Sequence, residues 1–206
     1  RRFFTCRLLI FDMPSVANTD IDIATAALIL IGAAPITSFT ETSTEALVAS
    51  NIYEDVIRSA LCASRWRFAA NQQELNRLSD APTGRFDLAY QLPSDLLMLH
   101  ALTVNNNIIE YNVYGDLAFT NGSITDKVIA DYSIRVGEEK FPSYFILAVE
   151  YALASAFAVS IARDDGLASV LENKAQQLMQ QARTLDSQQQ TTRKLSTSRF
   201  ITERRS

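Results

Sequence analysis

The chain offers few side chains whose type and spacing could support catalysis. His100 is the single histidine, and it lies in the apolar run 96–102 without a nucleophile or an acid at a recognised spacing. A general base needs such partners within hydrogen-bond reach. We therefore interpret His100 as a structural residue, and the sequence predicts no catalytic residue and no enzymatic activity.

Acidic residues, cysteines and glycines show no pattern typical of a metal or phosphate site. The acidic pairs 138–139 and 164–165 are adjacent and do not face each other, so loop and helix-capping roles explain them. Cys6 and Cys62 lie in different contexts, which excludes a disulfide framework, and one histidine is too few for a Cys/His zinc site. The six glycines stand singly, whereas a phosphate-binding loop needs several together. We expect no metal ion and no cofactor.

Charge is distributed unevenly along the chain, whose net charge is −4. Segment 183–206 has six basic residues against two acidic ones, and segment 1–12 has three arginines against one aspartate, which leaves −10 for residues 13–182. A basic segment can follow nucleic acid by charge alone, so nucleic-acid binding through the C-terminal tail is one hypothesis. Phe200 is the only aromatic residue of that tail, and the body is acidic. We therefore favour protein contact over DNA contact.

The apolar run Tyr144–Ala162 is the element that must organise the rest of the chain. As a helix it presents bulky residues every four positions, from Phe145 to Ile161, beside a groove of small residues, from Ala148 to Ser160. Glu150 lies near its middle, and a charge there costs about 2.5–3.5 kcal/mol in a bilayer. We interpret the run as a buried core helix and expect no membrane association.

Three further helices are predicted from caps and apolar periodicity. They are a helix of about Asp20–Ile31 capped by Thr19, a helix from a capping box at Thr42-x-x-Glu45 to about Trp66, and a last helix of about Leu167–Leu185. We expect the last helix to occupy the small-residue groove of the central helix and the first two to pack on its bulky ridge.

Between the second and third helices the apolar period changes to two, which is typical of strands. Phe86, Leu88, Tyr90 and Leu92 alternate with other residues, as do Val128 to Val136, and turn signals lie between them at Asn105–Asn107, Gly115-Asp116 and Asn121-Gly122. Asn-Gly suits a tight hairpin. The segment Pro93-Ser94-Asp95 either continues this pattern or opens a short helix.

The predicted fold is α+β: a mainly helical bundle of about four helices with an inserted antiparallel β meander and an extended C-terminal tail. Residues 1–12 begin like a signal peptide, but Arg7 interrupts the apolar run, and Met13 looks like a natural start. The expected parts are an N-terminal arm or upstream extension (1–18), the helical bundle (19–66 and 141–185), the β-rich insertion (67–140) and the basic tail (186–206).

Several local features occur in a fixed order from about Thr19 to Ile201. They are Ile31-Gly32-x-x-Pro35-Ile36, Trp66-Arg67-Phe68-Ala69, Tyr90-Gln91-Leu92-Pro93-Ser94-Asp95, Tyr114-Gly115-Asp116 leading to Thr120-Asn121, and Arg135-Val136 followed by Phe141-Pro142-x-x-Phe145. This dispersed set resembles the tail tubular protein A family, the head-to-tail adaptors of short-tailed bacteriophages. Residues 1–12 lie outside the resemblance.

The resemblance implies a structural virion protein at the portal vertex, synthesised in the host cytoplasm. It implies a homo-oligomeric ring, a dodecamer, between the portal protein and the tail nozzle protein, with packaged DNA passing through the lumen. An acidic body lining such a channel would repel phosphates and let DNA slide. Carried onto this chain, the portal-contact candidates are Arg193, Lys194, Arg199, Phe200, Ile201 and Arg204, and the nozzle-contact candidates are Asn105, Asn106, Asn107, Asn121 and Gly122.

Overall fold

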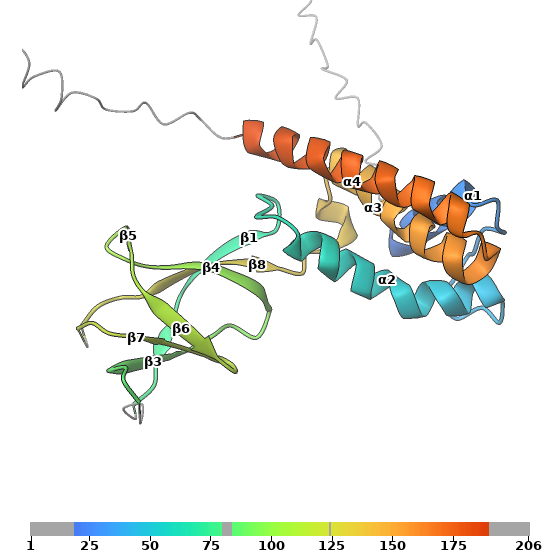
Figure 1. The fold of residues 1–206 in the computed structure, drawn as a ribbon. Helices are drawn as coiled ribbons and strands as arrows, with labels where there is room; N and C mark the ends of the chain where they lie inside the picture. The colour runs from blue at the N-terminus through green and yellow to red at the C-terminus, as the bar shows by residue number, and fades with distance from the viewer. Residues whose placement is uncertain (1–18, 80–83, 124, 190–206) are drawn as a thin grey trace, which may run out of the picture.

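A computed structural model describes residues 19–79, 84–123 and 125–189. Within these ranges the chain forms four α-helices and two antiparallel β-sheets, with all the strands between the second and third helices in sequence (Figure 1). The prediction of helices combined with antiparallel strands is therefore confirmed. The predictions for the N-terminal arm and for the tail beyond residue 189 lie outside the described residues.

The first two helices begin at capping side chains. Helix α1 (Asp20–Leu30) has a reciprocal capping box, in which the Thr19 hydroxyl accepts from the Asp22 N–H and the Asp22 carboxylate accepts from the Thr19 N–H. Helix α2 (Thr44–Cys62) is capped by Ser43, whose Oγ accepts from the Ala46 N–H at 3.2 Å. The predicted capping box, which starts at Thr42, is therefore wrong by one residue. The N-cap is Ser43, because its side chain is the one that accepts from a free N–H group of the first helical turn.

The last two helices are separated by a tight reversal. Helix α3 (Ser143–Phe157) continues into a π-helical turn (Ala158–Ala162) and ends at Arg163, which has a left-handed φ of 54°. Helix α4 (Asp165–Gln188) then starts at Asp164, whose Oδ1 accepts from the Leu167 N–H at 2.9 Å. The reversal lets α4 run back along α3, and the two pack together.

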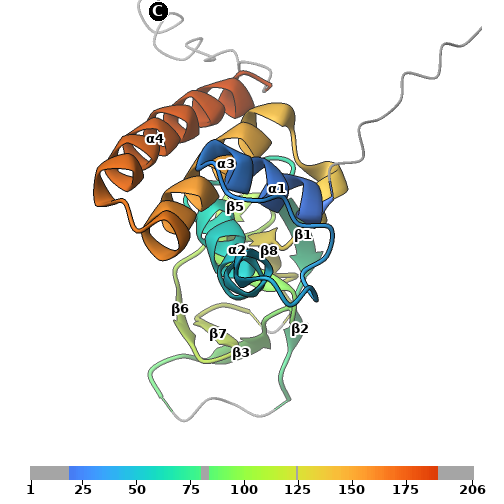
Figure 2. The same cartoon turned by 90° about the vertical axis from the view of Figure 1, so that its right-hand side faces the viewer.

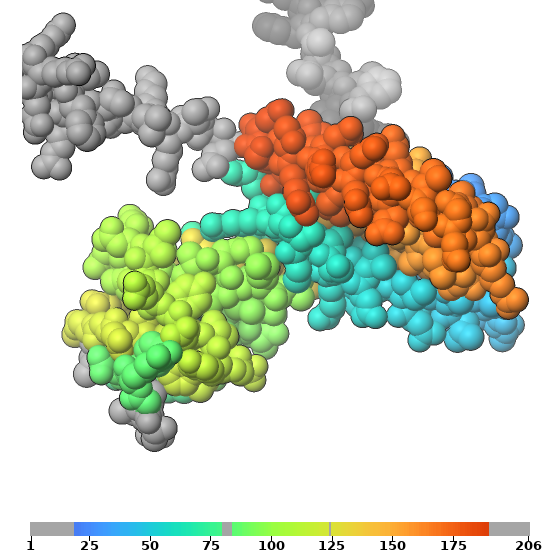
Figure 3. Space-filling model, in the orientation of Figure 1, coloured from blue at the N-terminus to red at the C-terminus, as the bar shows by residue number. Residues whose placement is uncertain are grey.

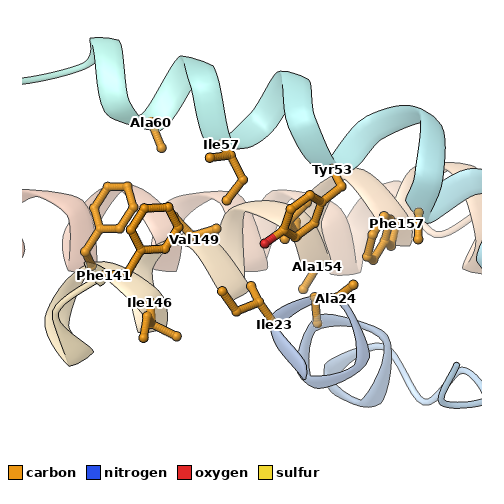
Figure 4. Close-up of a cluster of buried hydrophobic side chains, with 14 of the residues drawn as sticks. Ile23, Ala24, Tyr53, Ile57, Ala60, Phe141, Ile146, Val149, Ala154 and Phe157 are labelled. Carbon is orange, nitrogen blue, oxygen red and sulfur yellow. The ribbon is translucent and has the colours of Figure 1, made fainter. Parts of the chain in front are cut away.

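Helix α3 lies at the centre of the helical part and packs on the other three helices (Figure 2). Four residues of its predicted bulky ridge, from Phe145 to Phe157, are completely buried, whereas Ile161 is only partly buried. Figure 4 shows α2 on one side of this ridge and α1 on the other. The buried residues of this core include Phe145, Val149, Leu153 and Phe157 of α3, Ile23, Ala24 and Leu28 of α1, and Tyr53, Ile57 and Leu61 of α2.

The strands pair into two four-stranded sheets. One has the order β1 (Ala70–Glu74), β8 (Ile129–Ile134), β4 (Leu96–Val104), β5 (Asn107–Ile108), and the other has the order β2 (Asn76–Arg77), β3 (Leu88–Gln91), β7 (Leu117–Thr120), β6 (Tyr111–Tyr114). In a meander each strand pairs with the next, whereas here β8 lies between β1 and β4. The difference has a physical reason, because alternation specifies the buried face of a strand but not its partner. Residues 93–95 precede β4 and open no helix.

The β region has a buried core of its own, which includes Leu88, Tyr90, Leu102, Val128 and Tyr132. It projects from the helical part as a distinct lobe in the space-filling view (Figure 3). Ile134, at the end of β8, packs against both cores. Beside it, the guanidinium of Arg135 forms ion pairs with Glu54 of α2 at 3.1 Å and with Glu138 at 2.5 Å. These contacts fix the lobe to the helices.

Candidate functional site

Two turns that the sequence singled out meet at one cavity of about 240 Å³ in the β region. The β4–β5 turn contributes Asn105 and Asn107, and the segment that follows β7 contributes Asn121 and Gly122. Thus four of the five nozzle-contact candidates line a common cavity, and Asn106 is the one that does not. Their sequence separation gave no sign of this proximity.

The β4–β5 turn has the geometry of a two-residue hairpin. Val104 pairs with Asn107, and between them Asn105 and Asn106 have φ values of 49° and 65°. A type I′ turn needs positive φ at both central residues, and asparagine tolerates this conformation better than most residues. The backbone conformation of the turn by itself accounts for asparagine at positions 105 and 106.

The Asn121-Gly122 segment does not form the tight hairpin that its sequence predicted. It follows β7, and the Asn121 side-chain oxygen accepts from the Asp87 N–H at 3.0 Å. The hairpin prediction is wrong because Asn121 uses its side chain to hold the start of β3 against the end of β7. The β6–β7 turn is the tight one, with Gly115 at a φ of 60°.

Tyr90 is a cavity residue that sequence reasoning placed only in the core. Its side chain is 1% exposed, and its hydroxyl has no hydrogen-bond partner among the described residues. Burial raises the pKa of the Tyr90 phenol, with Arg77 opposing this shift and Asp126 reinforcing it, so the group keeps its proton at neutral pH. Alternation in the sequence predicts that Tyr90 is buried, but it cannot show whether the hydroxyl is paired.

Asp126 is the only acidic residue among the described residues that line this cavity. Its Oδ2 accepts from the Ser123 N–H at 3.2 Å, which orders the loop before β8. Among the described residues no three His, Cys, Asp or Glu side chains are grouped so that they could hold a metal ion. The cavity therefore presents neutral amide and hydroxyl groups beside one carboxylate.

His100 and Ser133 are as close as the histidine and serine of a catalytic pair, but the serine is buried. The Nε2 atom of His100 lies 2.8 Å from Ser133 Oγ across strands β4 and β8. Ser133 is completely buried, so its hydroxyl cannot meet a substrate in this conformation. Burial, with a smaller effect of Arg65, lowers the pKa of His100, which keeps the imidazole neutral at pH 7. This bond links the two neighbouring strands through their side chains.

An apolar groove of about 420 Å³ lies on the helical part between α2, α3 and α4. Small residues line it, with Ala60 on α2, Ala152 and Ser155 on α3 and Ala175 on α4, together with Met179 and the polar residues Asp55, Ser59, Glu172 and Gln176. The groove shows that α4 only partly fills the small-residue groove of α3.

The segment Ser143–Ala162 is long and apolar enough to cross a membrane by length and composition alone, a test that core helices of soluble proteins also pass. Its ridge of four bulky side chains, from Phe145 to Phe157, is buried against the other helices. The arrangement of this helix in the fold is therefore that of a core helix.

All six portal-contact candidates, Arg193, Lys194, Arg199, Phe200, Ile201 and Arg204, lie outside the described residues. The described residues end at Gln189. Asp186, near the end of α4, is 4% exposed and accepts hydrogen bonds from the backbone N–H of Arg67 and the hydroxyl of Tyr144. Sequence reasoning assigned Asp186 to the tail, and this is wrong because its carboxylate belongs to the core of the helical part.

No protein-family model matches the chain, and no curated protein matches it.

Proposed function

We propose that the protein is a head-to-tail adaptor that joins a portal protein to a tail nozzle protein in a short-tailed bacteriophage. The proposal takes the helical bundle and the C-terminal tail as the portal end and the β insertion as the nozzle end. The proposal starts from the resemblance to the tail tubular protein A family. In this proposal the subunits form a dodecameric ring around the DNA ejection channel.

The observation that carries the proposal is the division of the protein into two lobes with separate cores (Figures 1 and 3). An adaptor needs two surfaces that engage different partners without disturbing each other. Here the β4–β5 turn is well separated from the helical core, and the lobes meet at a small joint around Ile134 and Arg135.

An exposed apolar side chain on the β lobe supports this assignment. Ile108 is 77% exposed and follows the nozzle-contact candidate Asn107 directly in the chain. Single exposed apolar residues are common on soluble proteins, so Ile108 supports the assignment only because of its place beside Asn107.

The charge distribution also supports the role. Residues 13–182 have a net charge of −10, and an acidic channel wall would repel the phosphates of passing DNA. The basic tail, with six basic residues against two acidic ones in 183–206, can bind an acidic surface on another protein.

The proposal is tested by measuring the mass of the particle, alone and mixed with portal protein, by light scattering and by electron microscopy. We expect a ring of many copies that forms on the portal. A chain that stops after Gln189 keeps every described residue, so it should fold but fail to attach to the portal.

Two double substitutions distinguish the contribution of the apolar residues of the tail from that of its positive charge. Replacing Phe200 and Ile201 by alanine leaves the charge of the tail unchanged, whereas replacing Arg199 and Arg204 by glutamine leaves its apolar residues. Full attachment of the shortened chain would exclude the tail as the portal contact. Salt-sensitive binding of the whole chain to duplex DNA, with no portal binding, would favour the alternative of a nucleic-acid-binding protein.

A further inference from the structure

The groove of about 420 Å³ between α2, α3 and α4 combines an apolar lining with negative charge. Val56 and Met179 line it and stay only partly buried, although both pack against the helical core. Two acidic residues, Asp55 on α2 and Glu172 on α4, are exposed at the same groove, and none of its described lining residues is basic. The groove therefore suits a segment that carries both large apolar side chains and positive charge.

The residues that follow α4 have this composition. Segment 190–206 contains five basic residues against one acidic residue, so its net charge is +4, whereas that of the whole chain is −4. The rest of the chain therefore carries −8. Arg199 directly precedes the adjacent pair Phe200 and Ile201. One short stretch thus offers a cation beside two large apolar groups, which complements the groove in both respects.

The segment also starts at one end of the groove. Asp186, near the end of α4, accepts a hydrogen bond from the N–H of Arg67, just after α2, so the two helices end together. Figure 1 shows both ends on the side of the β lobe. Ala63, the C-cap of α2, lines the groove at this end. Segment 1–18 instead joins the fold at α1, which contributes no described residue to the groove.

The segment is long enough to run back along the groove. The lining residues of α4 extend from Met179 to Glu172, about 14 Å and about 24 Å from Gln188 at the helical rise. An extended chain spans about 3.3 Å per residue, so residues 190–200 reach about 36 Å, or about 23 Å after a four-residue reversing turn. Phe200 therefore reaches the groove, whereas Leu195 lies too soon after such a turn.

We propose that segment 190–206 of this chain binds in the groove, with Phe200 and Ile201 against the small residues and Arg199 beside Glu172. A groove of about 420 Å³ lies within the roughly 300–1,000 Å³ of sites that hold drug-sized ligands, so it has room for these two apolar side chains. The contact does not depend on the adaptor role, because groove and segment belong to one chain. In an adaptor, the portal and the groove compete for the same residues.

The test uses the full-length protein with the photoreactive amino acid p-benzoylphenylalanine in place of Phe200. On irradiation its ketone takes a hydrogen atom from a nearby C–H group, and the two carbon radicals then join. We expect a cross-linked product with the mass of a single chain. Peptide mass spectrometry should place the new bond at a residue that lines the groove, with Met179 as the expected site.

A variant with Asp55→Lys and Glu172→Lys should give about fivefold less of this cross-link, because two exposed ion pairs are lost. The matched control is Glu74→Lys with Glu110→Lys, which makes the same change of charge at exposed positions of the β lobe and should leave the yield unchanged. Arg199→Glu with Arg204→Glu leaves every described residue unchanged, so it cannot affect the described fold directly, and it should also lower the yield about fivefold.

Cross-links only to residues outside the groove, or none at all, would overturn the proposal. A product with the mass of two chains would assign the groove to a second copy of the protein and would overturn it too. Equal yields from the groove variant and the β-lobe control would show that the acidic residues do not recognise the segment, which contradicts the proposed contact. Failure of the protein to bind a portal leaves these outcomes unaffected, so the adaptor role and the groove contact are tested separately.

Discussion

The carboxylate of Asp186, near the end of α4, accepts a hydrogen bond from the hydroxyl of Tyr144, at the start of α3, with 2.9 Å between the oxygens. Its second oxygen accepts from the backbone N–H of Arg67 at 3.1 Å, just after α2. Asp186 is 4% exposed. One buried side chain thus joins three segments that are distant in sequence, at the point where the basic tail begins.

Replacing Asp186 by alanine should lower the free energy of unfolding by about 2–3 kcal/mol, because two partly buried hydrogen bonds lose their charged, buried acceptor. Urea unfolding followed by circular dichroism measures this change. Asp186→Asn is the control, since it retains one acceptor oxygen and should lose less than the alanine variant. If the alanine variant unfolds at the same urea concentration as the wild type, the carboxylate does not hold these segments together.

Arg135 should be equally important at the joint between the lobes. Its guanidinium pairs with Glu54 and Glu138 and lies 5.7 Å from the centre of the Phe141 ring, and its side chain is 22% exposed. Lysine cannot reproduce this planar, multiply bonded arrangement. We expect Arg135→Lys to lower the free energy of unfolding by about 1–2 kcal/mol in thermal or urea unfolding.

Arg58 provides the matched control for that substitution. It also pairs with Glu54, at 2.7 Å, but its side chain is 54% exposed and the pair lies within one helix. Such surface pairs contribute about 0.5 kcal/mol or less. Arg58→Lys should therefore be nearly neutral, and an equal effect of the two substitutions would contradict a special role for Arg135.

Glu150 gives the fold a predictable dependence on pH. Burial in the central helix raises the pKa of its carboxyl group above the ordinary value of 4.5. A carboxyl group with a raised folded pKa binds its proton more tightly in the folded state, so it disfavours folding when it is ionised. Its contribution therefore becomes more favourable as the pH falls through the folded pKa towards the unfolded value.

Glu150→Gln imitates the protonated form at every pH. We expect this variant to melt at a higher temperature than the wild type at pH 7, and the difference to shrink as the pH approaches 4. Scanning calorimetry across this range measures both. An equal melting difference at both ends of the pH range would show that the carboxyl group titrates alike in the folded and unfolded chains.

The helices could be predicted from the sequence because their signals are local. The Thr19 cap and Gly32, which has a φ of 74°, delimit α1 within one residue of the prediction, and the four-residue spacing from Phe145 identified the buried ridge of α3. Helix α2 ends at Cys62, before the expected Trp66, because the indole N–H of Trp66 instead donates to the Ala60 carbonyl at 2.8 Å after the chain has turned.

The sheets and the cavity depend on contacts that no local pattern contains. Alternation correctly predicted that Tyr90, Tyr132 and Val128 are buried. It could not show that β8 would lie between β1 and β4, or that the turn at Asn105 would meet the segment at Asn121. The same limit applies to the Tyr90 hydroxyl, whose lack of a partner depends on what surrounds it in space.

The β4–β5 turn allows backbone conformation to be separated from side-chain function. Asn106 has a φ of 65° and does not line the cavity. A residue with a Cβ is strained in this region by about 1–2 kcal/mol, less for asparagine, whereas glycine is not. Asn106→Ala should therefore lower the free energy of unfolding by about 1 kcal/mol, and Asn106→Gly should change it by less than about 0.5 kcal/mol, as measured by urea unfolding.

The glycine variant also tests the proposed nozzle contact, because it keeps the turn and removes only the side chain. If the Asn106 side chain contacts the nozzle protein, Asn106→Gly should weaken attachment of the nozzle while the stability of the free chain is unchanged. If both variants lose attachment only in proportion to their loss of stability, Asn106 stabilises the turn and does not contact the nozzle protein. The nozzle contact would then lie elsewhere on the lobe, and the exposed Ile108 would be the next residue to replace.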